Sequence, residues 1–123
     1  MTRNKTVNEF VKQKLEKRHD VRLLYLYNGN ELCTTIYADF TDKTLISFNH
    51  TTDPVLSAFG NNTLPTWFNF EAFLEERCLP RQRDRLREYL EVLGLNDYDP
   101  IEIIKITAGR MAEDNQWVQI EKL

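Results

Sequence analysis

The chain has 123 residues, of which 41% are hydrophobic and 28% are charged, and its formal net charge is −3. This length favours one domain, and the composition is that of a globular rather than a disordered protein. The mild negative charge argues against both a simple basic nucleic-acid binder and a strongly acidic nucleic-acid mimic. Apolar runs are short and the N-terminus shows no apolar leader, so we expect a cytoplasmic protein without membrane contact.

The N-terminal segment combines a predicted helix with a local excess of basic side chains. Thr6 and Glu9 match a capping box, and apolar residues then recur at helical spacing, which predicts an amphipathic helix over residues 7–17. The polar face of this helix and the residue after it carry Lys12, Lys14, Lys17 and Arg18. These basic groups are interpreted either as a solvated helix face or as a contact surface for an acidic partner or a phosphate backbone.

The next segment predicts three antiparallel strands. Residues 21–27 and 31–38 are rich in β-branched and aromatic side chains, and Asn28-Gly29 between them is a strong hairpin signal. A turn at 39–42 leads to a third predicted strand over 43–48. The meander carries aromatic side chains that one sheet face could bury, namely Tyr25, Tyr27, Tyr37, Phe40 and Phe48.

Short helices are predicted for the middle of the chain. Asp53-Pro54 starts a short helical turn that Gly60 ends, and Thr66 is a candidate N-cap for a helix over about 67–78. After Pro80, leucines recur at spacings of four and three, which predicts a helix over about 81–93.

The last segment predicts one more helix and a closing strand. Asp99-Pro100 starts the helix, with Glu102 completing a capping box, and Gly109 ends it. Val118 and Ile120 then alternate with polar residues, which suits a strand that pairs with the N-terminal sheet.

These elements predict an α+β fold with an N-terminal helix, a small antiparallel sheet and a C-terminal cluster of short helices. The sheet is a three-stranded meander with a possible fourth strand from the C-terminus. We expect a single domain over residues 1–123, with a sheet-rich subregion at 1–50 and a helical subregion at 66–123.

No catalytic, metal-binding or cofactor-binding pattern is evident. His19 and His50 do not stand at zinc-site spacings from Cys33 and Cys78, and both cysteines are expected to be buried. No glycine-rich phosphate loop occurs, and no pair of carboxylates stands out. We therefore expect a protein that is not an enzyme and that needs no cofactor or metal.

Arginines cluster after the middle of the chain and form the second candidate contact surface. The cluster consists of Arg77, Arg81, Arg83, Arg85 and Arg87, and Arg110 could join it. On a continuous helix Arg77, Arg81 and Arg85 would form one stripe, although Pro80 interrupts it. The cluster is either a salt-bridged solvated face or a guanidinium patch that binds a carboxylate-rich or phosphate-rich partner.

The two tryptophans are expected to pack in the core because apolar residues surround both in the sequence. An exposed tryptophan would instead indicate an interface, since this side chain often dominates binding energy there. We therefore predict a core position for Trp67 and Trp117, with an interface position as the alternative.

The segment from Phe73 to Ile120 resembles a pattern found in short mobile-element proteins of Firmicutes and in the N-terminal module of some HipA-like kinase proteins. The matching positions are Arg77, Pro80, Arg83, Leu86, Leu90, Leu93, Gly109, Asp114, Trp117 and Val118. No kinase domain follows within the sequence. Most of these residue types suit helix ends and core positions, so the resemblance implies a shared module more than a shared activity.

The sequence leads us to expect a non-enzymatic protein-binding inhibitor from a phage or mobile element that acts on a host defence effector such as a CRISPR nuclease. Anti-CRISPR proteins are similar in size and build. The alternative, implied by the resemblance, is a regulatory partner of a HipA-like toxin–antitoxin kinase. Direct nucleic-acid binding through the basic N-terminus is a secondary expectation because the net charge opposes it.

Overall fold

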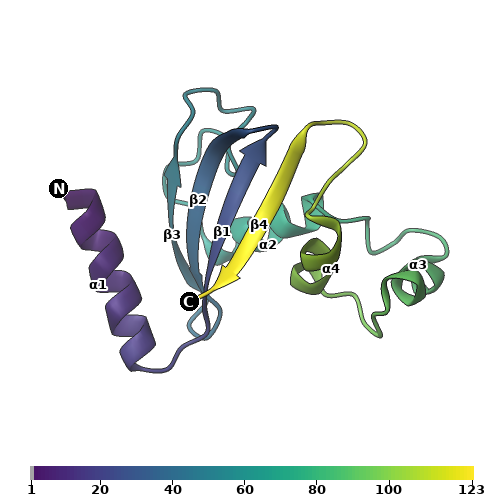
Figure 1. Cartoon of the computed structure of the whole chain (residues 1–123), viewed down its shortest axis with the longest axis horizontal. Helices are drawn as coiled ribbons and strands as arrows, with labels where there is room; N and C mark the ends of the chain where they lie inside the picture. The colour runs from purple at the N-terminus through teal and green to yellow at the C-terminus, as the bar shows by residue number, and fades with distance from the viewer. Residues whose placement is uncertain (1) are drawn as a thin grey trace.

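Helices and strands of the computed structural model follow the order that the sequence predicts, and the α+β fold is confirmed (Figure 1). The structure describes residues 2–123. The elements are α1 (Thr2–Glu16), β1 (Val21–Asn28), β2 (Glu31–Asp39), β3 (Thr44–Asn49), α2 (Trp67–Glu76), α3 (Leu86–Leu93), α4 (Pro100–Thr107) and β4 (Gln116–Lys122). Among the described residues, no helix is both long and apolar enough to cross a membrane.

The sheet is antiparallel throughout, with the strand order β3-β2-β1-β4. The predicted meander is confirmed, and β4 pairs with β1 along its length, as the alternation of Val118 and Ile120 predicts. Gly29 has a φ of 60°, a left-handed conformation that glycine adopts without steric cost, and so allows the hairpin to turn. Pairing places the C-terminal strand next to the first strand, where the Leu123 N–H donates to the Val21 carbonyl.

One face of the sheet packs against α2 and α4 to form the hydrophobic core. Leu24 and Leu26 of β1 are buried there against Phe70 of α2 and Ile103 of α4, among others. Trp67 also packs against this cluster through Phe40 and Phe70, so its predicted core role is confirmed. Because the cluster joins strands of the first half to helices of the second, the sheet-rich and helical subregions share one core.

The opposite face of the sheet is covered only in part, by α1. Figure 1 shows α1 standing on one side of the sheet, while α2 and α4 lie on the other and α3 lies farthest from α1. Side chains that alternate with the core residues on β1, such as Tyr25 and Tyr27, therefore point toward the layer of α1.

Helix starts differ from the predictions at several places. The helix α1 begins at Thr2, so Thr6 lies inside it and the predicted N-cap there is wrong. The segment after Pro54, which is predicted to form a short helical turn, forms several turns and no helix. The predicted helix over 81–93 begins only at Leu86, because Arg85 has a φ of 64°, which an α-helix cannot accommodate.

Two predicted helix caps are confirmed. The Thr66 side chain accepts from the N–H of Asn69, whose own side chain accepts from the Thr66 N–H, and this reciprocal pair fixes the start of α2. Asp99 caps α4 by accepting from the N–H of Ile101 and Glu102. The predicted return contact from Glu102 is wrong, because this side chain forms an ion pair with Lys105 instead.

Gly109 provides a test of close packing between α4 and β4. It has a φ of +63°, and a Cβ added there would lie 3.2 Å from the Cβ of Arg77 and 3.5 Å from Val118. We expect Gly109→Ala to lower the free energy of unfolding by about 2 kcal/mol, through backbone strain and crowding. Gly94→Ala is the matched control, since Gly94 also has a positive φ but nothing lies within 4 Å. Equal losses in urea unfolding would contradict the role of crowding.

Candidate functional site

Aromatic side chains gather on the sheet face that is turned away from α2 and α4. We call this surface the aromatic face; it consists of Tyr25 and Tyr27 of β1, Tyr37 of β2, Phe48 of β3 and Trp117 of β4. Strand register explains the grouping, because Tyr25 lies opposite Thr35, which pairs with Phe48, while Tyr27 lies opposite Trp117. The five rings are half-buried, so each keeps part of its surface accessible.

A stacked array forms at the β4 side of the aromatic face. The rings of Tyr27 and Trp117 are nearly parallel, at 11°, with centroids 4.5 Å apart. The guanidinium of Arg110 lies 5.2 Å from the Trp117 ring, within cation–π range. The indole N–H of Trp117 donates to the Gly29 carbonyl at 2.8 Å, which fixes the orientation of the ring. The predicted core role of Trp117 is therefore wrong, because the ring lies on the sheet face opposite the core.

A hollow of about 450 Å³ separates α1 from the other side of the aromatic face. Val7 of α1 lines it together with Tyr25, Tyr37 and Phe48 of the sheet. The C-terminal end of α1 thus contacts the sheet through Lys14. Toward Val7, α1 leaves the aromatic rings only partly covered.

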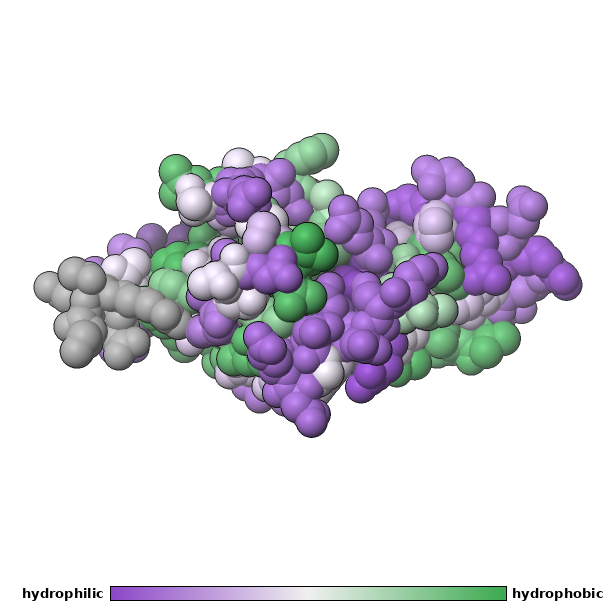
Figure 2. Space-filling model, turned by 90° about the horizontal axis from the view of Figure 1, so that it is seen from above, coloured by the Kyte–Doolittle hydropathy of each residue, from purple (hydrophilic) through white to green (hydrophobic). Residues whose placement is uncertain are grey.

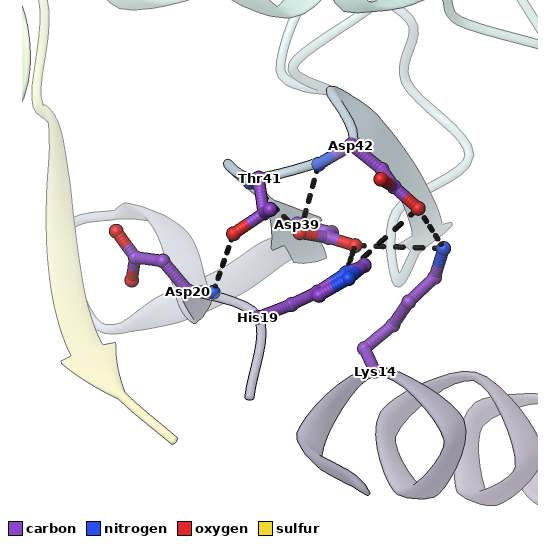
Figure 3. A network of polar contacts seen from close by, with 6 residues as sticks. All are labelled: Lys14, His19, Asp20, Asp39, Thr41 and Asp42. Atoms are coloured by element: carbon purple, nitrogen blue, oxygen red, sulfur yellow. Dashed lines mark hydrogen bonds and ion pairs between the residues drawn. The ribbon is translucent and has the colours of Figure 1, made fainter. Parts of the chain in front are cut away.

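An ion-pair network around buried Asp39 attaches α1 to the sheet (Figure 3). The ammonium of Lys14 lies 3.0 Å from the Asp42 carboxylate and 3.5 Å from that of Asp39, and Nδ1 of His19 lies 2.7 Å from the Asp39 carboxylate. His19, Asp39 and Asp42 place potential metal ligands together. Since the Lys14 ammonium already bonds both carboxylates, the group has its own cation and acts as an anchor for α1.

Titration of Asp39 gives this anchor a defined pH dependence. Burial alone would raise the pKa of Asp39, but hydrogen bonds from His19 and from the N–H groups of Asp42 and Thr41 lower it below 3.8. A depressed folded-state pKa stabilises the fold above the unfolded pKa, and this contribution is lost as the pH falls through the folded pKa.

We expect Asp39→Asn to lower the free energy of unfolding by about 2 kcal/mol near neutral pH, because charge-assisted hydrogen bonds are lost. The difference from wild type should vanish in acid, once the native carboxyl is protonated. Urea unfolding across a pH series measures this, with Asp42→Asn, on a half-exposed carboxylate, as the control. A difference that stays constant with pH would contradict the assignment.

The remaining candidate basic residues of the N-terminus do not share this anchor. Lys12 and Arg18 are exposed, whereas Lys14 is mostly buried by its two carboxylate partners. Of the three predicted contact residues, Lys12 and Arg18 are therefore solvated, and Lys14 anchors α1 to the sheet.

Arg77 lies in the interior, apart from the exposed arginines. Its guanidinium donates to both oxygens of the Asp114 carboxylate at 2.9 and 3.0 Å, and also to the carbonyls of Gly109 and Gln116. Only 7% of the side chain is exposed. The stripe that a continuous helix would form is absent, as the interruption at Pro80 suggests, because α2 ends at Glu76 and residues 77–85 are not helical.

Three other candidate arginines lie near partners of their own. Arg81 bonds Glu75 and stacks over Tyr98, with 4.3 Å from its guanidinium to the ring centre. The other two contacts are Arg83 over Tyr89 and Arg85 with Glu88. From above, the end of the molecule that carries α3 is covered mainly by hydrophilic residues (Figure 2). This surface is rich in exposed charges that are locally compensated.

Both cysteines are buried, as predicted, and neither is paired. Burial raises the pKa of the Cys78 thiol to about 12 and also raises that of Cys33. Both thiols therefore stay protonated near neutral pH, and a protonated thiol is a poor nucleophile and a poor metal ligand.

Sequence reasoning missed the aromatic face as a surface, although the signal was present. Tyr25 and Tyr27 alternate with Leu24 and Leu26, and this period of two separates rings from core residues once β1 is known to be a strand. What could not be read from the sequence was the register that sets Trp117 beside Tyr27. In comparisons with protein-family models, curated proteins and solved structures, this chain has no match.

Proposed function

We propose that the chain is a non-enzymatic protein-binding domain and that its aromatic face forms the contact surface. The observation that carries the proposal is the stacked array of Arg110, Trp117 and Tyr27 on an incompletely covered sheet face. Tryptophan, tyrosine and arginine are the side chains that most often dominate protein–protein binding energy. Their stacking and the indole hydrogen bond hold the array in one geometry, which lowers the entropic cost of binding.

The specific role that we propose is inhibition of a host defence effector, such as a CRISPR nuclease, by a protein of phage or mobile-element origin. Its support is the resemblance of the C-terminal segment to short mobile-element proteins, together with the small size of the chain. The arginines at 81, 83, 85 and 110 and the basic residues Lys12 and Arg18 stay candidate contacts, whereas Lys14 is engaged by Asp39 and Asp42.

Regulation of a HipA-like kinase is the second proposed function. Its support is the resemblance of the C-terminal segment to the N-terminal module of some HipA-like kinase proteins. Several of the resembling positions lie together: Arg77 bonds Asp114, Gly109 lies against Arg77, and Val118 donates to the Ala108 carbonyl beside Gly109. These contacts join the end of α2 to the loop between α4 and β4. A module with this internal clamp would keep its fold in proteins of different activity.

Affinity purification of the tagged protein from a nuclease-treated bacterial lysate, followed by mass spectrometry, tests the proposal. We expect a specific protein to be enriched and to stay bound in moderate salt. A defence effector supports the inhibitor role, and a HipA-like kinase supports the second function. Recovery of nucleic acid alone from an untreated lysate, released by moderate salt, would contradict protein binding as the main role.

A further inference from the structure

The outer side of α2 combines exposed apolar side chains with exposed carboxylates. Phe68 is 77% exposed, and Leu64, just before the helix, is 84% exposed. Glu71 and Ala72 follow Phe68 at spacings of three and four residues and so lie beside it on either side, and Glu76 follows Ala72 by four residues and lies next to it. We call this surface, from Leu64 to Glu76, the outer face of α2. Since Phe70 and Phe73 bury the inner side, this surface points away from the sheet.

Charge on this surface is not balanced within the described part of the chain. Glu75 bonds Arg81, whereas neither Glu71 nor Glu76 lies within ion-pair distance of a described cationic group. The helix contributes no exposed basic residue of its own. Lys43 and Arg81 line a hollow with Glu71, but neither forms an ion pair with it. The outer face of α2 therefore carries two carboxylates that are available to a cation from outside.

The surface is also hollowed where its smallest side chain lies. Hollows of about 350 and 460 Å³ meet at Ala72 and Glu76, which line both of them. One lies between α2 and the loop that contains Phe59, and the other extends toward Pro80. Side chains of a bound segment would find space on either side of Ala72 while remaining close to a carboxylate.

We propose that the outer face of α2 is a docking surface for a protein segment that carries a large apolar side chain next to lysine or arginine. The apolar side chain covers Phe68, which is exposed to water in the free domain. The basic side chains pair with Glu71 and Glu76. Charge complementarity selects this partner over an acidic one, and apolar contact gives affinity beyond that of solvated ion pairs. This surface is distinct from the aromatic face and lies on the other side of the sheet.

Titration of the isotope-labelled full chain with a helical lysine–leucine peptide, read by amide chemical shifts at physiological salt, tests the proposal. We expect shifts centred on Phe68, Ala72 and Glu76, and none with a glutamate–leucine peptide of equal length. The combined variant Phe68→Ala, Glu71→Gln and Glu76→Gln should raise the Kd at least tenfold. Val92→Ala with Glu91→Gln, an exposed apolar and acidic pair on α3, is the matched control and should leave the Kd unchanged.

Three outcomes would overturn this proposal. Chemical-shift changes scattered over acidic residues all over the protein would mean nonspecific electrostatic attraction. Changes confined to the aromatic face would place the bound segment there instead. Shifts on α2 that grow with protein concentration before peptide is added would identify a second copy of the chain as the occupant. Trp117→Ala should leave peptide binding unchanged, so failure here is distinguishable from failure of the proposed function.

Discussion

Replacing Arg77 by alanine is expected to lower the free energy of unfolding by about 4 kcal/mol, the largest loss that we expect from a single charged residue. The guanidinium is buried and donates four hydrogen bonds, two of them to Asp114. Its removal leaves the carbonyls of Gly109 and Gln116 without this donor and opens a cavity between α2 and β4. Typical domains are stable by 5–15 kcal/mol, so such a loss approaches the whole margin. Urea unfolding followed by circular dichroism measures it.

Two variants make the Arg77 result interpretable. Arg77→Lys keeps the positive charge but cannot form the bidentate pair with Asp114, so we expect an intermediate loss. Arg85→Ala removes an exposed ion pair with Glu88 and should change stability by less than about 0.5 kcal/mol. If Arg77→Ala were as stable as Arg85→Ala, the buried clamp would not support the fold.

Replacing Trp117 by alanine is expected to weaken binding to the protein partner at least thirtyfold, or by about 2 kcal/mol. The substitution removes the centre of the stacked array, so Tyr27 and Arg110 lose the ring that positions both. Stability should fall by only about 1 kcal/mol, because the stacking contact is half-exposed. Calorimetric titration of the purified partner with wild-type and variant protein measures the affinity directly.

Arginine variants distinguish binding through the aromatic face from binding through the arginine surface, which consists of Arg81, Arg83 and Arg85. Arg110→Ala should weaken binding less than Trp117→Ala but in the same direction, since Arg110 stacks on the ring. Reversing Arg81, Arg83 and Arg85 to glutamate together should preserve folding, because these side chains are outside the core. If that triple reversal abolishes binding while Trp117→Ala does not, the partner binds the arginine cluster. The proposal that it binds the aromatic face would then be wrong.

Local signals predicted much of the fold because their physical causes are themselves local. Asn28-Gly29 indicates the hairpin, because both positions tolerate the backbone conformation of its turn. Thr66 and Asp99 indicate helix starts, since a cap depends on a few neighbouring backbone groups. The helix expected after Pro80 illustrates the limit. The leucine spacing correctly predicts that this helix extends to Leu93. It starts only at Leu86, because Arg85 has a left-handed backbone conformation.

The candidate site was less predictable because it depends on contacts between distant segments. Arg77 is indistinguishable in sequence from its exposed neighbours, and only the approach of Asp114, 37 positions later, makes it internal. Trp117 looks like a core residue until strand register assigns it to the outer face with Tyr27. His19 and Lys14 likewise become an anchor only when the turn after β2 brings Asp39 and Asp42 beside them.

Photo-crosslinking from the aromatic face is the most direct test of protein binding through this surface. A benzoylphenylalanine placed at Tyr27 preserves an aromatic side chain beside Trp117, and the same group at Arg85 reports on the arginine surface. We predict that irradiation in living bacterial cells joins the Tyr27 variant to one specific protein and that the Arg85 variant gives no such product. The same protein crosslinked only from position 85, or nucleic acid alone crosslinked from position 27, would contradict the proposed function.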